Sequence, residues 1–187
     1  MTKYLIIYGS KEGQTAKIAQ FMGDIIVQDG HEVDLYNAKT FPEHLSLEAY
    51  TGILVGSSVH MGHWSTPTRN FIRKFNTQLE SIPSAFFSVS MSATSPDSMA
   101  TTRLDHQVQK YLKPTGWQPK NKVHFAGCVA FTKYGFFTKT MMRAIAKSQN
   151  QSTDTSQDHE YTNWDNVTEF VKGFMEEAEL AHHHEDN

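Results

Sequence analysis

The amino-acid sequence predicts an α/β protein built on a doubly wound parallel sheet, with right-handed crossovers and helices on both faces. Two observations carry this prediction. Strand-like and helix-like patterns alternate five times along the chain, and several strand-length runs are nearly all apolar instead of alternating between apolar and polar residues. Strands with both faces buried have this pattern, and regular alternation of strand and helix favours parallel pairing.

The strands are expected where the apolar runs lie, at Tyr4–Tyr8, Val33–Tyr36, Ile53–Val55, Ala85–Val89 and Val123–Phe131. In such a sheet, ligands bind beyond the carboxyl ends of the strands, at the point where the strand order reverses. A site is therefore expected in the loops that follow the strands: Gly9–Thr15, Gly56–Ser65, Ser90–Ser98 and the stretch after Phe131.

Apolar residues at helical spacing predict the helices between these strands. They recur from Ile18 to Ile26, from Phe71 to Leu79 and from Leu104 to Leu112. The first helix is expected to end at Gly30, a natural left-handed cap, and the second before Pro83. A last helix is expected to begin at Thr162-Asn-Trp-Asp165, which is like a capping box, and to bury Val167, Phe170, Val171, Phe174 and Met175.

The chain has 187 residues, 39% of them hydrophobic and 20% charged, which is ordinary for a globular protein. We expect residues 1–180 to form one domain and residues 181–187 to form a disordered, His-rich tail. A single cysteine, Cys128, excludes an internal disulfide framework, and it is expected to be a small buried hydrophobe. No secretory leader precedes the first strand, and no apolar run reaches the roughly 18 to 20 residues that cross a bilayer, so the expected compartment is the cytoplasm.

Charge is distributed unevenly along the chain, although the net charge is only -3. No Asp or Glu lies between His106 and Thr153, a window that contains eight Lys or Arg residues. After Thr153, Lys172 is the one basic residue among ten acids. A surface of one sign attracts the opposite sign over about a Debye length, so anionic partners are expected for the basic window.

The first loop, Gly9-Ser-Lys-Glu-Gly-Gln-Thr15, has the properties of an anion site. It supplies successive backbone N–H groups, two hydroxyls and the positive end of the helix that follows, which together hold a phosphate well. Plain helix capping is the alternative. The loop is neither a Walker A nor a dinucleotide fingerprint, so a monoester phosphate is the better fit.

The spacing Ile6-Ile7-Tyr8-x-Ser10-x-x-Gly13-x-Thr15-x-x-x-Ala19 resembles the flavodoxin signature and departs from it only at the last apolar position, Met22. The resemblance implies a flavodoxin-like sheet of five parallel strands in the order 2-1-3-4-5. It also implies that FMN is the cofactor and that this loop wraps its phosphate. The residues it assigns to FMN here are Ser10, Lys11, Glu12, Gly13, Gln14 and Thr15.

Polar side chains after the third and fourth strands are expected beside the flavin ring. Ser57 and Ser58 can donate hydrogen bonds to phosphate or ribityl oxygens, and His60 or Trp64 can cover a ring face. Trp64 has an alternative, packing against the helix of Phe71 and Phe75. The fourth strand and its loop contribute Ser88, Ser90, Met91 and Ser92, with hydroxyls and a polarizable thioether at the ring edge. His60-x-x-His63 lacks a third ligand, so no zinc site is predicted.

Three further segments resemble the flavodoxin-like, menaquinone-dependent protoporphyrinogen oxidases of heme biosynthesis: Ile82–Ala93, Ala126–Phe131 and Ser152–Val167. The likeness covers nearly the whole chain. It implies that the protein binds FMN, oxidises protoporphyrinogen IX to protoporphyrin IX and passes electrons to a membrane quinone, menaquinone. It adds Phe86, Asp154 and Thr155 to the residues expected at the cofactor.

A long basic segment at about 132–158, between the fifth strand and the last helix, is a feature of that family. Lys139, Arg143 and Lys147 fall on one helical face, and Phe137, Met141 and Ile145 on the other, which predicts a basic amphipathic helix. With Lys133, these cations are expected to contact anionic lipid headgroups at the inner face of the cell membrane, or the substrate propionates. An ordinary surface helix packed on the sheet is the alternative.

Two other functions remain open for a chain of this fold: a soluble electron carrier without a substrate of its own, and an FMN-dependent quinone reductase. Carriers of this fold are usually strongly acidic and shorter after the fifth strand, so the acid-free window disfavours the first. Nucleic-acid binding is not expected, because the basic residues are not interleaved with an exposed aromatic platform.

Overall fold

The computed structural model describes residues 2–60, 62–95, 98–148 and 151–185. Its main sheet consists of five parallel strands in the order β2 (Glu32–Asn37), β1 (Lys3–Gly9), β3 (Gly52–His60), β5 (Ser84–Ser90) and β6 (Asn121–Ala126). This is the expected order of a flavodoxin-like sheet, so the predicted fold class is confirmed. The sequence did not predict β4 (His63–Trp64), which folds back as an antiparallel hairpin on the end of β3.

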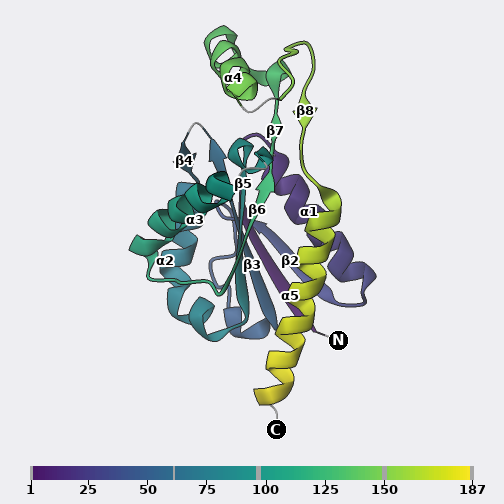
Figure 1. The fold of residues 1–187 in the computed structure, drawn as a ribbon. Coiled ribbons are helices and arrows are strands. Elements are labelled where there is room, and N and C mark those ends of the chain that lie inside the picture. The colour runs from purple at the N-terminus through teal and green to yellow at the C-terminus, as the bar shows by residue number, and fades with distance from the viewer. Residues whose placement is uncertain (1, 61, 96–97, 149–150, 186–187) are drawn as a thin grey trace.

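Helices cover both faces of the sheet (Figure 1). One face packs against α1 (Gln14–Gln28) and α5 (Trp164–Glu185), the other against α2 (Thr66–Ser81) and α3 (Ser98–Leu112). Single 3₁₀ turns lie between these elements: η1 (Leu47–Ala49), η2 (Met91–Thr94), η3 (Lys113–Thr115) and η4 (Phe131–Lys133).

Alternate residues of the central strands explain why the sheet has two cores. Ile6 and Leu54 face the core of α1 and α5, whereas Leu5, Ile7 and Ile53 face the core of α2 and α3. All five side chains are fully buried. A strand inside such a sheet must be apolar at every position, and this is the pattern that the sequence shows.

The basic segment after β6 forms a small unit beyond the carboxyl edge of the sheet (Figure 1). The predicted strand Val123–Phe131 is interrupted after β6, and β7 (Cys128–Val129) pairs instead with β8 (His159–Glu160) in a separate antiparallel ribbon. Between them lies α4 (Phe136–Ser148). We call residues 127–161 the insertion.

The insertion has its own apolar core, formed by Val129, Phe131, Met142 and Ala146. The predicted apolar face of α4 is therefore partly wrong. Met141 is 36% exposed, whereas Met142, the next residue, is buried. The helix is rotated relative to the expectation because its neighbours are the insertion's own ribbon and turn, not the main sheet.

The chain end also differs from the expected disordered tail at 181–187. α5 continues to Glu185, so residues 181–185 are helical, and residues 186–187 lie outside the described part. Among the described residues, no helix combines the length and apolarity that a membrane span requires.

Candidate functional site

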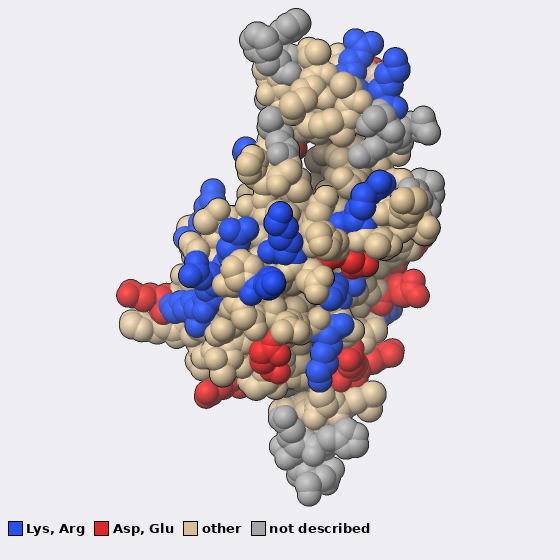
Figure 2. All heavy atoms as spheres, turned by 60° about the vertical axis from the view of Figure 1, so that its left-hand side comes forward, with Lys and Arg blue, Asp and Glu red and all other residues tan. Residues whose placement is uncertain are grey.

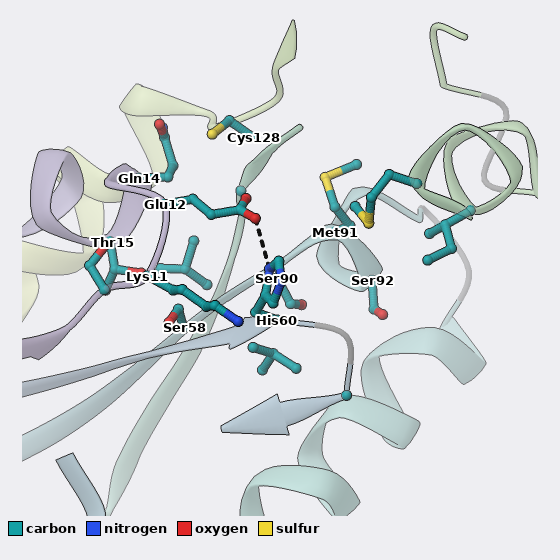
Figure 3. A pocket seen from close by; sticks show the side chains of 17 residues that line it. Lys11, Glu12, Gln14, Thr15, Ser58, His60, Ser90, Met91, Ser92 and Cys128 are labelled. Carbon is teal, nitrogen blue, oxygen red and sulfur yellow. Dashed lines mark ion pairs between the residues drawn. The ribbon is translucent and has the colours of Figure 1, made fainter. Parts of the chain in front are cut away.

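A pocket opens where the loops after β1, β3 and β5 meet beneath the insertion (Figure 3). This is the position at which ligands bind in doubly wound sheets. The first loop and the start of α1 contribute Ser10, Lys11, Glu12, Gln14 and Thr15. The third strand and its loop contribute Ser58, Val59, His60 and Gly62, and the end of β5 with η2 contributes Val89, Ser90, Met91 and Ser92.

The loop before α1 has the geometry of an anion site. Gly13 has a φ of 107°, a left-handed conformation that side chains disfavour, and no side chain caps the N-terminus of α1. The N–H of Gly13 donates to Ser10 Oγ over 3.0 Å, which curls the loop. The first turn of α1 contains no acidic residue. The helix therefore presents N–H groups and its positive dipole end to the pocket.

Two buried hydroxyls in the pocket wall lack partners in the described part of the chain, Thr15 Oγ1 and Ser90 Oγ. A buried polar atom without a hydrogen bond costs about 1–3 kcal/mol, so such atoms point to a ligand. One lies at the phosphate loop and the other at the end of β5. A phosphate monoester carrying a flat polar ring would reach both, so the donor set fits FMN.

Glycine is required where the loop meets α2. A Cβ on Gly9 would lie 2.0 Å from Ser65 Oγ, so the backbone of β1 runs directly under the N-terminus of α2. The Ser65 side chain caps that helix by accepting from the N–H of Thr68. At the end of β1, Gly9 therefore allows close packing against α2, and the next residue, Ser10, lines the pocket.

Three of the predicted cofactor residues lie in the sheet core and not in the pocket wall. Ser57 is fully buried and accepts from the N–H of Ser65. Ser88, one pleat deeper than Ser90, hydrogen-bonds to His124 Nδ1 over 2.7 Å. Phe86 packs between the rings of Trp64, Tyr111 and Trp117. Phe86 and Ser88 lie further down β5 than Ser90, whereas the Ser57 side chain turns toward the start of α2, where Ser65 donates to it.

Trp64 follows the packing alternative. Its ring stacks on Tyr111 of α3 at 4.7 Å with an interplanar angle of 20°. Its neighbour His63 is exposed, and His60 contacts Glu12. In the described part of the chain no three metal-binding side chains gather, and the two histidines have different environments.

Asp154 and Thr155 lie in the connection from α4 to β8, outside the pocket wall. The Asp154 carboxylate accepts hydrogen bonds from the N–H and hydroxyl of Ser156, which lower the pKa of Asp154. The carbonyl of Thr155 accepts a hydrogen bond from Lys139 Nζ over 3.2 Å. Lys139 therefore braces the insertion, while Arg143 and Lys147 of the same helix are exposed. The side chain of Lys133 lies outside the described part.

The insertion supplies wall residues that the sequence did not reveal: Gly127, Cys128, Met142 and Ile145. Cys128 was expected to be buried in a strand, but it is partly exposed because the chain leaves the sheet at Gly127. The resemblance had indicated an insertion at this point. The side chains of the insertion that face the pocket depend on how α4 packs. The apolar periodicity of the sequence alone could not predict that packing.

The Glu12 carboxylate connects the insertion to the loops that line the pocket. Glu12 Oε1 lies 2.8 Å from His60 Nδ1, and Glu12 Oε2 accepts a hydrogen bond of 2.6 Å from the Tyr134 hydroxyl (Figure 3 shows the ion pair). Burial first, and then the bond to Glu12, raise the pKa of Tyr134, which keeps its proton. A second connection runs from Gln14 Nε2 to Thr162 Oγ1, over 2.8 Å, at the other end of the insertion.

Comparison with known proteins also indicates a flavodoxin-like chain. Residues 5–156 match the flavodoxin domain family. The chain is 29% identical over 180 residues to the protoporphyrinogen IX dehydrogenase (quinone) of Escherichia coli K12, covering 96% of this chain and 95% of that one. It is 29% identical over 174 residues to the protein of that name from Leishmania major, covering 92% of this chain and 74% of the relative.

Solved structures with the same fold include oxidised Flavodoxin 1 from Bacillus cereus, with a TM-score of 0.51 at 16% identity, covering 94% of this chain and 98% of that one. A short-chain flavodoxin associated with a PDU bacterial microcompartment has a TM-score of 0.53 at 12% identity, covering 95% of this chain and 99% of that one. At these identities the likeness is one of fold.

Proposed function

The chain belongs to the flavodoxin domain family, and from this premise we propose that it is an FMN-dependent oxidoreductase that converts protoporphyrinogen IX to protoporphyrin IX and passes the electrons to a membrane quinone, menaquinone, in heme biosynthesis. The observation that carries the proposal is the composite pocket. Loops typical of a flavin site form one side, and apolar side chains of the insertion form the other. The relatives named protoporphyrinogen IX dehydrogenase (quinone) align over 96% and 92% of this chain.

The chain's own residues have distinct tasks in this proposal. Ser10, the N–H groups from Gln14 onward and Thr15 would hold the phosphate. Ser58 and Ser90 would orient the ring by hydrogen bonds, and Met91, Met142 and Ile145 would exclude water from its exposed edge. When bound, FMN supplies the two-electron chemistry, while the protein supplies orientation, charge and access.

The apolar side of the pocket supports a large, flat, poorly soluble substrate. An electron carrier needs only an exposed flavin edge, whereas Met142 and Ile145 add a wall beside it. Arg143 and Lys147 are exposed on the same helix as that wall. We propose that these two cations attract the propionates of the porphyrinogen or the anionic headgroups of the membrane that holds the quinone. The protein would then work in the cytoplasm, at the inner face of the cell membrane.

Anaerobic turnover tests this function. The protein is reconstituted with FMN, freed of excess cofactor and mixed with protoporphyrinogen IX, with and without a menaquinone analogue. We expect the bound flavin to give a yellow protein, and protoporphyrin fluorescence to rise catalytically only when the quinone is present. A colourless protein would contradict FMN binding. A flavin that is reduced by a partner reductase but never by the porphyrinogen would support the carrier, and quinone reduction without porphyrin dependence would support the quinone reductase.

A further inference from the structure

The Glu12 carboxylate lies in the loop proposed for the phosphate, and its two oxygens contact residues outside that loop. Oε1 contacts His60 Nδ1 at the end of β3, and Oε2 accepts from Tyr134 in the insertion. The Tyr134 oxygen also accepts a bond of 3.4 Å from the N–H of Ala130, so its one proton is directed to Glu12. Both carboxylate oxygens therefore serve as hydrogen-bond acceptors.

This arrangement fixes the orientation and tautomer of the His60 ring. A carboxylate oxygen 2.8 Å from Nδ1 requires a proton on Nδ1, whether the ring is neutral or charged. In the neutral ring, Nε2 is then the atom with a free lone pair. Among the described residues Nε2 has no hydrogen-bond partner, and His60 belongs to the pocket wall. Its side chain is only 15% exposed, so its access is to the pocket more than to bulk water.

We propose that Glu12 and His60 form a proton-accepting dyad, in which Glu12 is the positioning residue and His60 Nε2 is the general base. The inference rests on the proposed function and deepens it, because it names the group that takes the proton of the substrate. A base held by a carboxylate through its other nitrogen is the usual arrangement for general-base catalysis by histidine.

The proton balance of the proposed reaction requires such a group. In each two-electron oxidation a C–H bond of a bridging methylene breaks, and its hydrogen leaves with the electron pair to the oxidant of the proposed reaction. A pyrrole N–H bond breaks as well, its proton goes to His60 Nε2, and the remaining electron pair completes the new double bond between bridge and ring. His60 then releases the proton to solvent before the next step. Three such steps remove three C–H and three N–H hydrogens. A proton of the remaining bridge then moves to a pyrrole nitrogen by tautomerisation, so that four C–H and two N–H hydrogens are lost in all.

Other titratable side chains lie near His60 besides Glu12. Lys11 comes from the first loop, Tyr134 and Cys128 come from the insertion, and His63 stands opposite His60 in the β3–β4 hairpin. A general base accepts a proton only in its unprotonated form, so turnover should fall at low pH.

A tautomer measurement tests the geometry without any cofactor. Long-range ¹⁵N–¹H correlation spectra of the labelled, cofactor-free protein report which ring nitrogen carries the proton. We expect His60 to be protonated at Nδ1 in its neutral form, and Glu12→Gln to remove that preference. The exposed His63 is the matched control, since His63→Gln should leave the His60 signals in place. A neutral His60 protonated at Nε2 in the unsubstituted protein would overturn the dyad.

Kinetics test the role in catalysis. In the FMN-loaded protein we expect His60→Gln to lower kcat for porphyrinogen oxidation by at least about 100-fold, the low end for loss of a general base, and to abolish the acid limb of the pH profile. Because kcat is measured with FMN bound to saturation, a change in the Kd for FMN does not account for this loss. His63→Gln should match the unsubstituted protein in kcat and pH profile. Glu12→Gln should lower kcat less than His60→Gln does, and Glu12→Asp should recover part of the loss.

The outcomes separate the dyad from the function on which it rests. If the unsubstituted protein oxidises porphyrinogen and His60→Gln keeps its kcat and pH profile, the dyad is wrong and the proposed function stands. If the unsubstituted protein binds FMN but never oxidises porphyrinogen, the proposed function fails, and the base role of His60 fails with it whatever the tautomer.

Discussion

Single residues support the proposal that this loop binds an anion and does more than cap a helix. The hydroxyl of Thr15 is buried in the first turn of α1, and the described part of the chain offers it no partner. The hydroxyl of Thr68, in the first turn of α2, contacts the Gly56 carbonyl at 3.3 Å and Ser65 Oγ at 2.9 Å. The two buried threonines each lie at the start of a helix. They differ in whether the described part of the protein offers their hydroxyl a hydrogen-bond partner.

This difference predicts opposite effects of the same substitution. Thr15→Val should raise the free energy of unfolding of the cofactor-free protein by about 1 kcal/mol, because it removes a buried hydroxyl without a partner in the described part of the chain, and weaken FMN binding by about 1 kcal/mol, or roughly fivefold in Kd. Thr68→Val should instead lower the free energy of unfolding by about 1 kcal/mol. Chemical denaturation and flavin fluorescence titration measure the two quantities. A Thr15→Val protein that binds FMN normally would remove Thr15 from the site.

Gly13 allows a second test at the residue scale. Its φ of 107° strains any other residue by about 1–2 kcal/mol, although a Cβ there would meet no atom within 4 Å. Gly13→Ala should therefore weaken FMN binding about tenfold by distorting the loop. Gly173→Ala, also without a contact and in the middle of α5, is the control and should raise stability by about 0.5–1 kcal/mol. Equal effects of the two substitutions on FMN binding would contradict the assignment of the loop.

At the scale of elements, α3 is bound to the start of α2 by one aromatic residue. The Tyr111 hydroxyl donates to the Ser65 carbonyl over 2.7 Å, and the guanidinium of Arg69 lies 4.8 Å from the centre of its ring. Trp64 of the short β4 stacks on the ring of Tyr111. We call these contacts of Tyr111 with Ser65, Arg69 and Trp64 the seam. The seam holds the hairpin that carries His60 against the rest of the molecule.

This seam predicts a loss of stability at high pH. Burial raises the pKa of Tyr111 to about 12 from the model-peptide value of 10.0. Between these values the folded protein binds more protons than the unfolded chain, so the free energy of unfolding falls as the pH rises through this range. Tyr111→Phe should flatten the fall and cost about 1 kcal/mol at neutral pH for the lost hydrogen bond. An unchanged slope between about pH 10 and 12 would show that Tyr111 is not the group responsible.

The exposed cations of α4 indicate where an anionic membrane would bind under the proposed function. Arg143→Glu with Lys147→Glu should abolish sedimentation with vesicles that contain anionic lipid, because both side chains are exposed on α4. Lys139 is left unchanged, since it bonds the Thr155 carbonyl. The control is Lys110→Glu with Lys113→Glu, which changes the charge equally at a groove beside the C-terminal end of α3. If the control loses binding and the α4 variant keeps it, the membrane faces α3.

The sequence predicts those parts of the structure that local contacts determine, and it does not predict those that depend on contacts between distant residues. The five parallel strands and the helices between them follow from apolar periodicity, because burial on two faces leaves a clear pattern. Ser10 and Thr15, which the loop spacing singled out, line the pocket. Ser57, Ser88 and Phe86 were expected at the cofactor but lie outside the pocket wall, because the contacts that bury their side chains come from distant parts of the chain. The partners of Glu12 are 48 and 122 residues away from it and could not be predicted.

At the scale of the whole molecule, the charge asymmetry of the sequence becomes a property of the surface. Figure 2 shows Lys and Arg side chains gathered over one broad face, with Asp and Glu mainly toward its margins. Lys110, Lys113 and Lys122 surround the groove between the end of α3 and the start of β6. The groove lies beside the amino-terminal end of β6, whereas the pocket lies at the carboxyl edge of the sheet. We propose that residues 1–180 act as one domain, with the insertion as its pocket wall.

The central claim is that FMN binds where the first loop, the ends of β3 and β5 and the insertion meet. A crystal structure of the FMN-loaded protein tests it most directly. We expect the phosphate to lie against the N–H groups that begin α1, with the Thr15 hydroxyl as a partner, and the ring to lie between His60 and Met91 with Met142 and Ile145 beside it. A phosphate bound elsewhere, or a ring outside the space between the insertion and the sheet, would contradict the account.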